Sequence, residues 1–467
     1  MSFLIKKNRK LYPIIFYFFN FVFCQYIPQE FYQNHFMDFS YDRGNNWELL
    51  SSLSSNRYNH KNTDKYQHDK LYANVIGGLR TYGNATSIYF YTLFKFKENL
   101  YGYLYPRIVN DPLLFKRFTG IPREISRFSF NSGETDLSGI GYENNWLLFQ
   151  IGRGRESWGA GNDIQLALNH NSGPYDYFLL ASDYGQVRVR YIHGFLGSNL
   201  ENFNSYLTAR GIEYTNKENF LISISEKVVY SGLNRSIDFS YLNPISTHLE
   251  IELNNRLNSR GYDGANAVWQ LSLDWFLFSK VRASFNLLYD EFVIDQSQIE
   301  SGKEHGKAYS CRLALPYNIK NLNIFFFSSY IYVGTPVFRH LVGTNNFINR
   351  NIPLGWQHGS DGHEFTLGIN TLHNDNFMMY LKFGRRDIGS ESITSRPYDS
   401  YKDYTRGNFP SGIVDKKLFL DFDIKYWFRT NMLGLLYFEV ENNLNGKVAK
   451  SIGVGIDVRY GKKFNNL

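Results

Sequence analysis

The stretch that decides the fold lies close to the carboxyl end, where residues 451–460 have the sequence SIGVGIDVRY. Ile452, Val454, Ile456 and Val458 alternate with serine, glycine and charged residues. Successive side chains of a β-strand point to opposite faces, so this segment has one apolar face and one polar face. Such a strand fits a wall that has lipid on one side and water on the other.

The same alternation recurs along most of the chain. Between residues 418 and 427, for example, Asp421, Asp423 and Lys425 share a row opposite an apolar row. A soluble β-sandwich can show this pattern over short strands. Here the apolar faces extend over about ten residues, the length that a tilted strand needs to cross a bilayer, and this favours a membrane barrel. The clearest further examples are residues 187–191, 220–225, 269–275, 281–287 and 436–441.

Composition supports the same class of protein. Aromatic residues make up 18% of the 467 residues, yet the mean hydropathy is only -0.37. A barrel with aromatic girdles and a polar lumen has this combination. The 50 Lys and Arg against 43 Asp and Glu give a net charge of +7, but the charges are scattered, which argues against nucleic-acid binding. A basic lumen or rim would attract acidic glycans or lipopolysaccharide, and an ordinary solvated surface explains the charge equally well.

The amino terminus predicts export. Lys6, Lys7, Arg9 and Lys10 precede a short apolar run that ends at Cys24, as in a secretory signal peptide, so we expect residues 1–24 to be removed. Val22 and Phe23 fit a lipoprotein signal poorly. The only other cysteine is Cys311, so we expect no disulfide in the mature chain and interpret Cys311 as a small lipid-facing or core residue.

The alternating runs indicate the organisation of the mature chain. They number 16 to 20, and because single-chain bacterial barrels have even strand numbers, the sequence predicts an all-β, transmembrane antiparallel barrel of 18 strands with short irregular or helical plug elements. The longest polar intervals, at 296–306, 339–362 and 387–416, are candidate extracellular loops. The predicted units are a polar N-terminal segment at 25–70, the barrel at 71–461, an irregular insertion near 106–126, and a tail at 462–467.

The stretch 151–177 is the least repetitive part of the chain. Arg153, Arg155 and Trp158 could offer guanidinium groups and a ring face to an acidic sugar, or they could form a lumen-facing network. On a strand, His170 and Ser172 would share a face and could act as base and nucleophile, but the surrounding string of Asn, Ser, Gly and Pro is more typical of a turn. No cysteine or histidine pattern predicts a metal site, and we expect no cofactor.

Three stretches resemble the capsule assembly Wzi family of outer-membrane barrels. The first contains Gly152-Arg153, Trp158-Gly159-Ala160-Gly161, Leu168-Asn169, Asn171 and Tyr175-Asp176-Tyr177. The second is Tyr191-Ile192-His193-Gly194. The third contains Glu226, Tyr241-Leu242-Asn243-Pro244, Asn254-Asn255 and Tyr289-Asp290-Glu291. Together they cover residues 145 to 295, and their order is more specific than any one of them.

This resemblance implies a partly plugged 18-stranded barrel in the outer membrane of a Gram-negative bacterium. It implies a non-enzymatic lectin that attaches or assembles capsular or exopolysaccharide at the cell surface, in contact with lipid and lipopolysaccharide, and we expect a monomer. The candidate ligand-binding residues are Arg153, Arg155, Trp158, Asn169, Asp176 and Asn243. Two alternatives stay open: a pore or glycan-export channel, and a lipid-modifying enzyme that would depend on His170 and Ser172.

Overall fold

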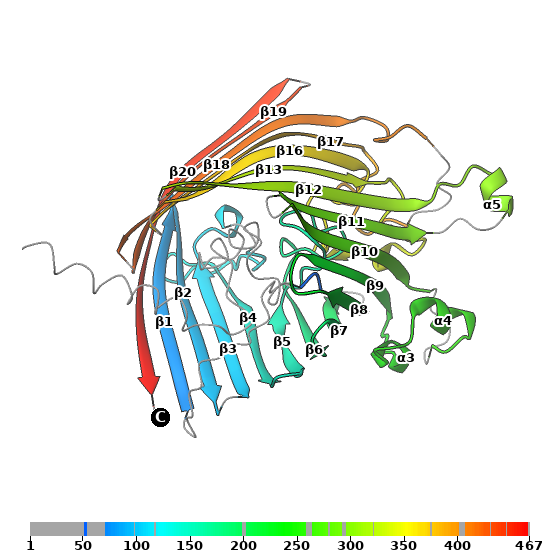
Figure 1. The fold of residues 1–467 in the computed structure, drawn as a ribbon, viewed down its shortest axis with the longest axis horizontal. Helices are drawn as coiled ribbons and strands as arrows, with labels where there is room; N and C mark the ends of the chain where they lie inside the picture. Colours follow the sequence, from blue (N-terminus) through cyan, green and yellow to red (C-terminus); the bar gives the residue numbers. More distant parts are fainter. Residues whose placement is uncertain are drawn as a thin grey trace, which may run out of the picture.

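Eighteen antiparallel strands form one sheet that closes on itself, because the last strand pairs with the first (Figure 1). The structure is a computed structural model. It describes residues 51–53, 71–97, 99–115, 118–198, 202–257, 264–278, 281–291, 296–320, 322–373, 376–400, 407–429, 431–444 and 446–465. The predicted all-β barrel of 18 strands is confirmed.

Each strand of the barrel pairs with the strands before and after it, and β13 pairs with β16 across a long connection. The strands are β1 (Leu71–Tyr82), β2 (Ala85–Phe96), β3 (Leu100–Val109), β4 (Ser132–Glu143), β5 (Leu147–Gly154), β6 (Tyr175–Asp183), β7 (Val187–Ser198), β8 (Phe203–Thr215), β9 (Phe220–Leu233), β10 (Asn266–Leu277), β11 (Val281–Glu291), β12 (Gly306–Ile319), β13 (Leu322–Val333), β16 (Gly362–His373), β17 (Phe377–Ile388), β18 (Asp415–Arg429), β19 (Met432–Asn443) and β20 (Lys447–Asn465).

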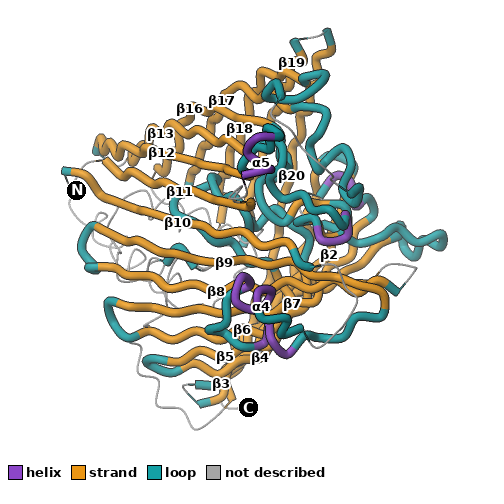
Figure 2. The backbone as a smooth tube through the Cα atoms, turned by 90° about the vertical axis from the view of Figure 1, so that its right-hand side faces the viewer, coloured by secondary structure: helices purple, strands orange, loops and turns teal. Residues whose placement is uncertain are grey.

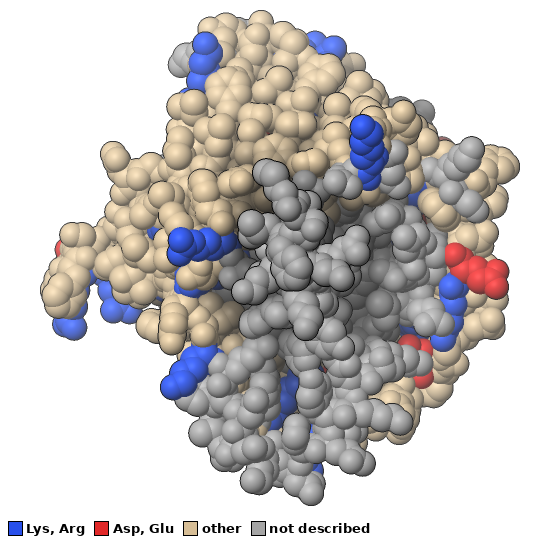
Figure 3. All heavy atoms as spheres, turned by 60° about the vertical axis from the view of Figure 1, so that its left-hand side comes forward, with Lys and Arg blue, Asp and Glu red and all other residues tan. Residues whose placement is uncertain are grey.

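The two faces of the wall have the predicted chemistry. On β10, Gln270 and Asp274 are buried inside the barrel, whereas Leu271 and Trp275 are exposed on the outside. Cys311 is also exposed, on β12. Figure 3 shows one face of the molecule, where the described atoms are mostly uncharged and the charged residues are scattered. An apolar exterior around a closed sheet is the arrangement that lets strands cross a membrane, since every backbone group is paired within the sheet.

The two ends of the barrel differ in the length of their connections. Short turns join the strands at the end where β1 begins and β20 finishes, and the long connections lie at the other end. These long connections carry η1 (Pro112–Leu114), α3 (Phe239–Leu242), α4 (His248–Leu253), α5 (Gln296–Glu300), η2 (Gly343–Asn345), β14 (Ile348–Asn349) and β15 (Ile352–Pro353) (Figure 2). Among the described residues, no helix is long and apolar enough to cross a membrane. In outer-membrane barrels the long loops are extracellular, so all three predicted loop regions lie at the expected end.

Two predicted boundaries are wrong. The insertion expected at 106–126 begins later, because residues 106–109 complete β3 and pair with β4 after a bulge at Tyr105 and Pro106. The tail expected at 462–467 is largely strand, because β20 continues to Asn465 in register with β1. The predicted signal peptide lies outside the described residues, as does most of the N-terminal segment 25–70, of which only residues 51–53 are described.

Candidate functional site

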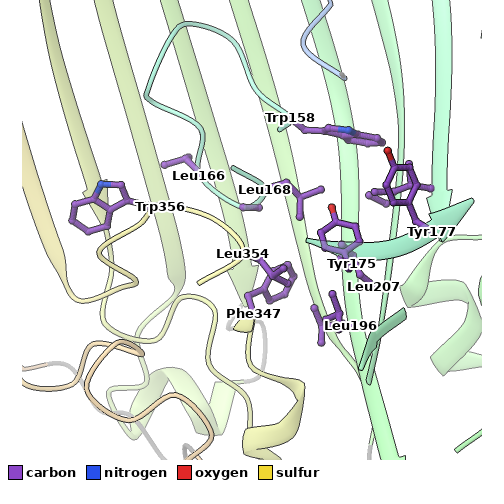
Figure 4. Packing of buried hydrophobic residues seen from close by; sticks show 14 of the residues in the cluster. Trp158, Leu166, Leu168, Tyr175, Tyr177, Leu196, Leu207, Phe347, Leu354 and Trp356 are labelled. Atoms are coloured by element: carbon purple, nitrogen blue, oxygen red, sulfur yellow. The ribbon is translucent and has the colours of Figure 1, made fainter. Parts of the chain in front are cut away.

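Three long connections fold back into the barrel and fill much of its interior with a hydrophobic core. Residues 155–174, 334–361 and 389–400 contribute to this core, and so does Leu53. We call this set of inward-folded segments the plug. Figure 4 shows part of it, with side chains from the loops and from the wall directed toward one another. The largest contributors are Trp158, Ile164, Leu166, Leu168, Phe338, Phe347, Leu354, Trp356 and Ile393, packed on wall residues such as Tyr175, Ile192 and Leu207.

Backbone hydrogen bonds tie the segments of the plug together. The Trp158 N–H donates to the Leu168 carbonyl (3.1 Å), which closes the first loop on itself. The Trp356 N–H donates to the Leu166 carbonyl (2.9 Å), and the Asn169 N–H donates to the Leu354 carbonyl (2.7 Å). Because buried backbone groups must be paired, these bonds allow irregular chain to occupy the lumen.

Three of the predicted ligand residues help to build the plug. Trp158 is 0% exposed, and its indole Nε1 donates to Glu156 Oε2 at 3.1 Å. Arg155 is buried and donates from Nε to the Ser172 carbonyl at 2.7 Å, while Asn169 is buried beneath the second loop. The side chains of Arg155, Trp158 and Asn169 are therefore enclosed, as expected for the alternative interpretation of a lumen-facing network.

Ion pairs line the polar inner wall. Arg80 and Asp457 join β1 to β20 (2.8 Å), and Arg282 pairs with Asp274 on β10 (2.5 Å). Arg188 pairs with the buried Glu213 at 3.1 Å. Burying charges is costly unless they are paired, so each of these arginines meets a carboxylate. Comparable buried pairs are Arg107–Asp136 and Arg155–Asp136.

Glu213 also binds the described part of the N-terminal segment. Its Oε2 accepts hydrogen bonds from the Ser52 N–H (2.6 Å) and the Ser52 hydroxyl (2.8 Å). The Gly159 N–H donates to the Ser52 carbonyl at 2.7 Å, and Leu53 enters the hydrophobic core. Residues 51–53 are thus fastened both to the barrel wall and to the first loop of the plug.

Arg153 and Asp176, the other two predicted residues in this region, lie at the rim of the barrel. Arg153 pairs with Asp176 (3.0 Å) and with Glu134 (3.2 Å). Arg350, from the second plug loop, donates to the same Glu134 carboxylate at 2.9 Å. Thr119 donates to Glu134 as well. We call Thr119, Glu134, Arg153, Asp176 and Arg350 the rim cluster. It joins β4, β5 and β6 to two long loops at the end with long connections.

The rim cluster presents charged side chains to solvent. The side chains of Asp176 and Arg350 are 63% and 43% exposed. Arg350 and Asn351 form the tight turn between β14 and β15 with positive φ values of 51° and 64°, and both residues are exposed. The Asn351 N–H donates to the Tyr398 hydroxyl (3.3 Å), so an exposed aromatic ring lies close by. Exposed guanidinium, carboxylate and ring groups could bind a hydrophilic polymer.

Asn243 lies in a different connection from the rim cluster, and its hydrogen bonds are with other residues. It follows α3 in the connection between β9 and β10, is exposed, and donates to the Ser246 hydroxyl (2.9 Å). The structure therefore does not bring Asn243 together with the other predicted residues. Its contacts lie on the outer side of the barrel wall.

His170 and Ser172 lie in a turn rather than on a strand. The Ser172 N–H donates to the Asn169 carbonyl (3.1 Å), and the buried Ser172 hydroxyl has no hydrogen-bond partner in the described part of the chain. His170 Nε2 lies 3.9 Å from Asp163. The catalytic hypothesis required His170 and Ser172 to share one face of a strand, and the structure does not place them on a strand. The described residues also contain no group of three or more His, Cys, Asp or Glu that could hold a metal ion.

Comparison with solved structures gives a clear match for the whole barrel. Wzi of Escherichia coli, described as an outer membrane protein involved in group 1 capsule assembly and as a carbohydrate-binding β-barrel, superimposes with a TM-score of 0.60. The match covers 91% of this chain and 96% of Wzi at 11% identity. The barrel fold is that of Wzi. The resemblance found in the sequence is thus confirmed at the level of the fold, which is that of Gram-negative outer-membrane β-barrels.

Other matches are looser. OprD of Pseudomonas aeruginosa gives a TM-score of 0.45 at 10% identity, over 85% of this chain and 95% of OprD, and OccK3 of the same organism gives 0.43 at 8% identity, over 84% and 95%. In sequence, no known family and no curated protein matches the chain.

Sequence reasoning missed four residues of this surface: Thr119, Glu134, Arg350 and Tyr398. The polarity of the interval 339–362 predicts a loop, but its spacing does not show that the loop turns inward and returns Arg350 to the rim. The buried aromatic and aliphatic residues of this interval, such as Phe347 and Trp356, are the one available signal that the loop has a core of its own.

Proposed function

We propose that this protein binds capsular or exopolysaccharide at the outer surface of the outer membrane and retains it there without catalysing a reaction. The rim cluster carries the proposal, because it exposes Asp176 and Arg350 on residues fixed by ion pairs, and Asn351, next to Arg350, donates to the exposed Tyr398. Wzi, which has the same fold, is described as carbohydrate-binding. We further infer that the protein acts as a monomer, since closing the sheet leaves no strand edge that needs a partner.

The second candidate is a pore. One observation favours it: inward-facing Lys417, Asp421 and Glu441 on β18 and β19 keep about a third of their side-chain surface exposed. The plug argues for the lectin, because the loops packed across the lumen support a binding surface at the rim. A lipid-modifying enzyme has the least support, because its proposed base and nucleophile are held in a turn.

Cells that carry rim variants test the lectin function. We expect Arg350→Ala combined with Tyr398→Ala to shift surface polysaccharide from the cell-bound fraction to the medium without reducing the total amount. A matched control is Arg429→Ala, which removes an exposed arginine at the opposite end of the barrel and should leave retention unchanged. Unchanged retention in the rim variant, with the protein present at wild-type level, would contradict the proposed site.

A further inference from the structure

The barrel wall carries a polar cluster on its outer face, where lipid-facing residues are expected. Strand pairing aligns Leu180, Tyr191, Arg210 and Glu226 in one row across β6 to β9, and Leu180 is exposed on the outside. Paired residues of a sheet share a face, so the whole row points outward. The neighbouring rows add His193, Tyr206 and Tyr230. We call Tyr191, His193, Tyr206, Arg210, Glu226 and Tyr230 the wall cluster.

The residues between these rows confirm the direction. Ile192, Leu207 and Val229 lie one position along the same strands and belong to the core inside the barrel. Tyr206 and Tyr230 instead belong to a separate core with Tyr241, Ile251 and Ala265. The wall therefore has a hydrophobic core on each side at this place.

The first part of the connection between β9 and β10, residues 234–257, covers the outer core. We call these residues the flap. The Tyr191 hydroxyl donates to the Tyr241 carbonyl (2.7 Å), and Arg210 donates to the Asn243 carbonyl (2.9 Å). The His248 N–H donates to Glu226 (3.0 Å). The rings of Tyr230 and Tyr241 stack at 4.7 Å. In Figure 1, α3 and α4 lie beside β9 on the outside of the barrel.

The flap satisfies polar groups that would otherwise face acyl chains. Arg210 and Glu226 form an ion pair (3.2 Å), and the Tyr230 hydroxyl bonds His193 Nε2 (3.0 Å). All four side chains are buried although they are on the outer face. Charged and polar groups in the hydrocarbon region are costly unless they are paired and enclosed, so a cover over this part of the wall is required in a bilayer.

The opposite face of the flap exposes several large apolar side chains, together with Glu252 and the ion-paired Glu250 and Arg256. Phe239 on α3 is 75% exposed and Leu253 at the end of α4 is 74% exposed, while Tyr241 and Ile251 point to the wall. Ile237, Ile245 and Leu249 are exposed as well. This face continues the apolar exterior of the barrel, where Phe195 and Ile224 are exposed on the adjoining strands. An exposed patch of this kind marks an interaction surface.

We propose that the flap is a membrane-embedded cover whose apolar face packs against lipid acyl chains of the outer leaflet. The flap replaces the lipid-facing surface where the wall itself is polar. It would anchor the long-loop end of the barrel in the leaflet at one side, in the way that interfacial helices bury an apolar face at the boundary between headgroups and acyl chains.

Nitroxide accessibility tests this placement. In the full chain with Cys24→Ser and Cys311→Ser, single labels are attached at Phe239→Cys or Leu253→Cys, and the protein is reconstituted in phosphatidylcholine liposomes. Collision rates with oxygen, which concentrates in the bilayer, are compared with those of a water-soluble nickel chelate. Ile224→Cys on the barrel wall is the lipid control, and Tyr398→Cys at the rim is the water control.

We expect both flap labels to match the Ile224 label, with high oxygen and low nickel collision rates. Nickel collision rates equal to those of the Tyr398 label would overturn the proposal and would indicate a flap in water. Low collision rates with both reagents would also overturn it and would indicate a protein contact instead of lipid. The labelled side chains are already exposed, so the barrel should fold, and retention of far-UV circular dichroism checks this.

Discussion

Removing the indole of Trp158 should loosen the plug while leaving the barrel intact. Trp158 is fully buried, and truncating a buried tryptophan to alanine costs about 3–5 kcal/mol. At about 1.4 kcal/mol per factor of ten, local opening of the loop 155–174 would become about 10²- to 4 × 10³-fold more frequent. The Glu156 carboxylate would also lose the N–H donor that now lies 3.1 Å away.

Hydrogen exchange measured by mass spectrometry on the micelle-bound protein reports this opening. In Trp158→Ala, the amides of residues 158–168 should lose protection by that factor, and those of the strands β10 to β13 should not change. Trp158→Phe keeps a ring but removes the donor to Glu156, and should cost about 1–3 kcal/mol. Trp146→Ala, on a short turn at the opposite end, is the control. Unchanged exchange in Trp158→Ala would refute the conclusion that this ring holds the plug together.

Three further predictions concern the loops of the plug. In Gly355→Ala the new Cβ would clash with the Leu166 carbonyl oxygen, so the loops must separate and the Trp356 amide should exchange faster. Asp361→Asn places an amide donor among the N–H and O–H donors of Glu391 and Ser411, and should cost about 1–3 kcal/mol, seen as faster exchange in residues 389–400. Burial and the nearby Arg386 guanidinium lower the pKa of His358 well below its ordinary value of 6.5. As the pH falls below about 6.5, the unfolded chain therefore binds a proton at His358 that the folded chain does not, and the free energy of unfolding decreases. Urea unfolding should give a smaller free energy of unfolding at pH 5.5 than at pH 7.5, and His358→Gln should reduce this difference.

The barrel could be predicted from the sequence because its signal is local. Each strand alternates apolar and polar residues with a period of two, as in Ile452 to Val458, and lipid outside and water inside enforce this period along the whole wall. Counting these runs gives 16 to 20 strands, a range that includes the observed 18, and the alternation gives the faces of the clearest strands, such as β10 and β18. The ends of β3 and β20 did not follow, because pairing with a neighbouring strand, and not composition, decides where a strand stops.

The plug, the rim and the flap could be predicted only in part, because they depend on contacts between distant residues. The motif around Trp158 departs from the strand pattern, but its spacing does not reveal that Glu156 accepts from the ring or that Asn169 bonds to Leu354. The alternation at residues 187–191 places Tyr191 on the apolar row with Val187 and Val189, and this is the outer row of β7. Nothing in the local sequence shows that Tyr241, fifty residues later, returns to cover it.

Ion conductance across a planar bilayer tests the central claim most directly. If loops packed around Trp158 and Trp356 close the lumen, the purified full-length protein should insert and show almost no current at moderate voltage. Trp158→Ala should produce occasional brief openings. Stable, ohmic current steps of the size typical of open porins, recorded from the unmodified protein, would contradict the account and would favour a channel.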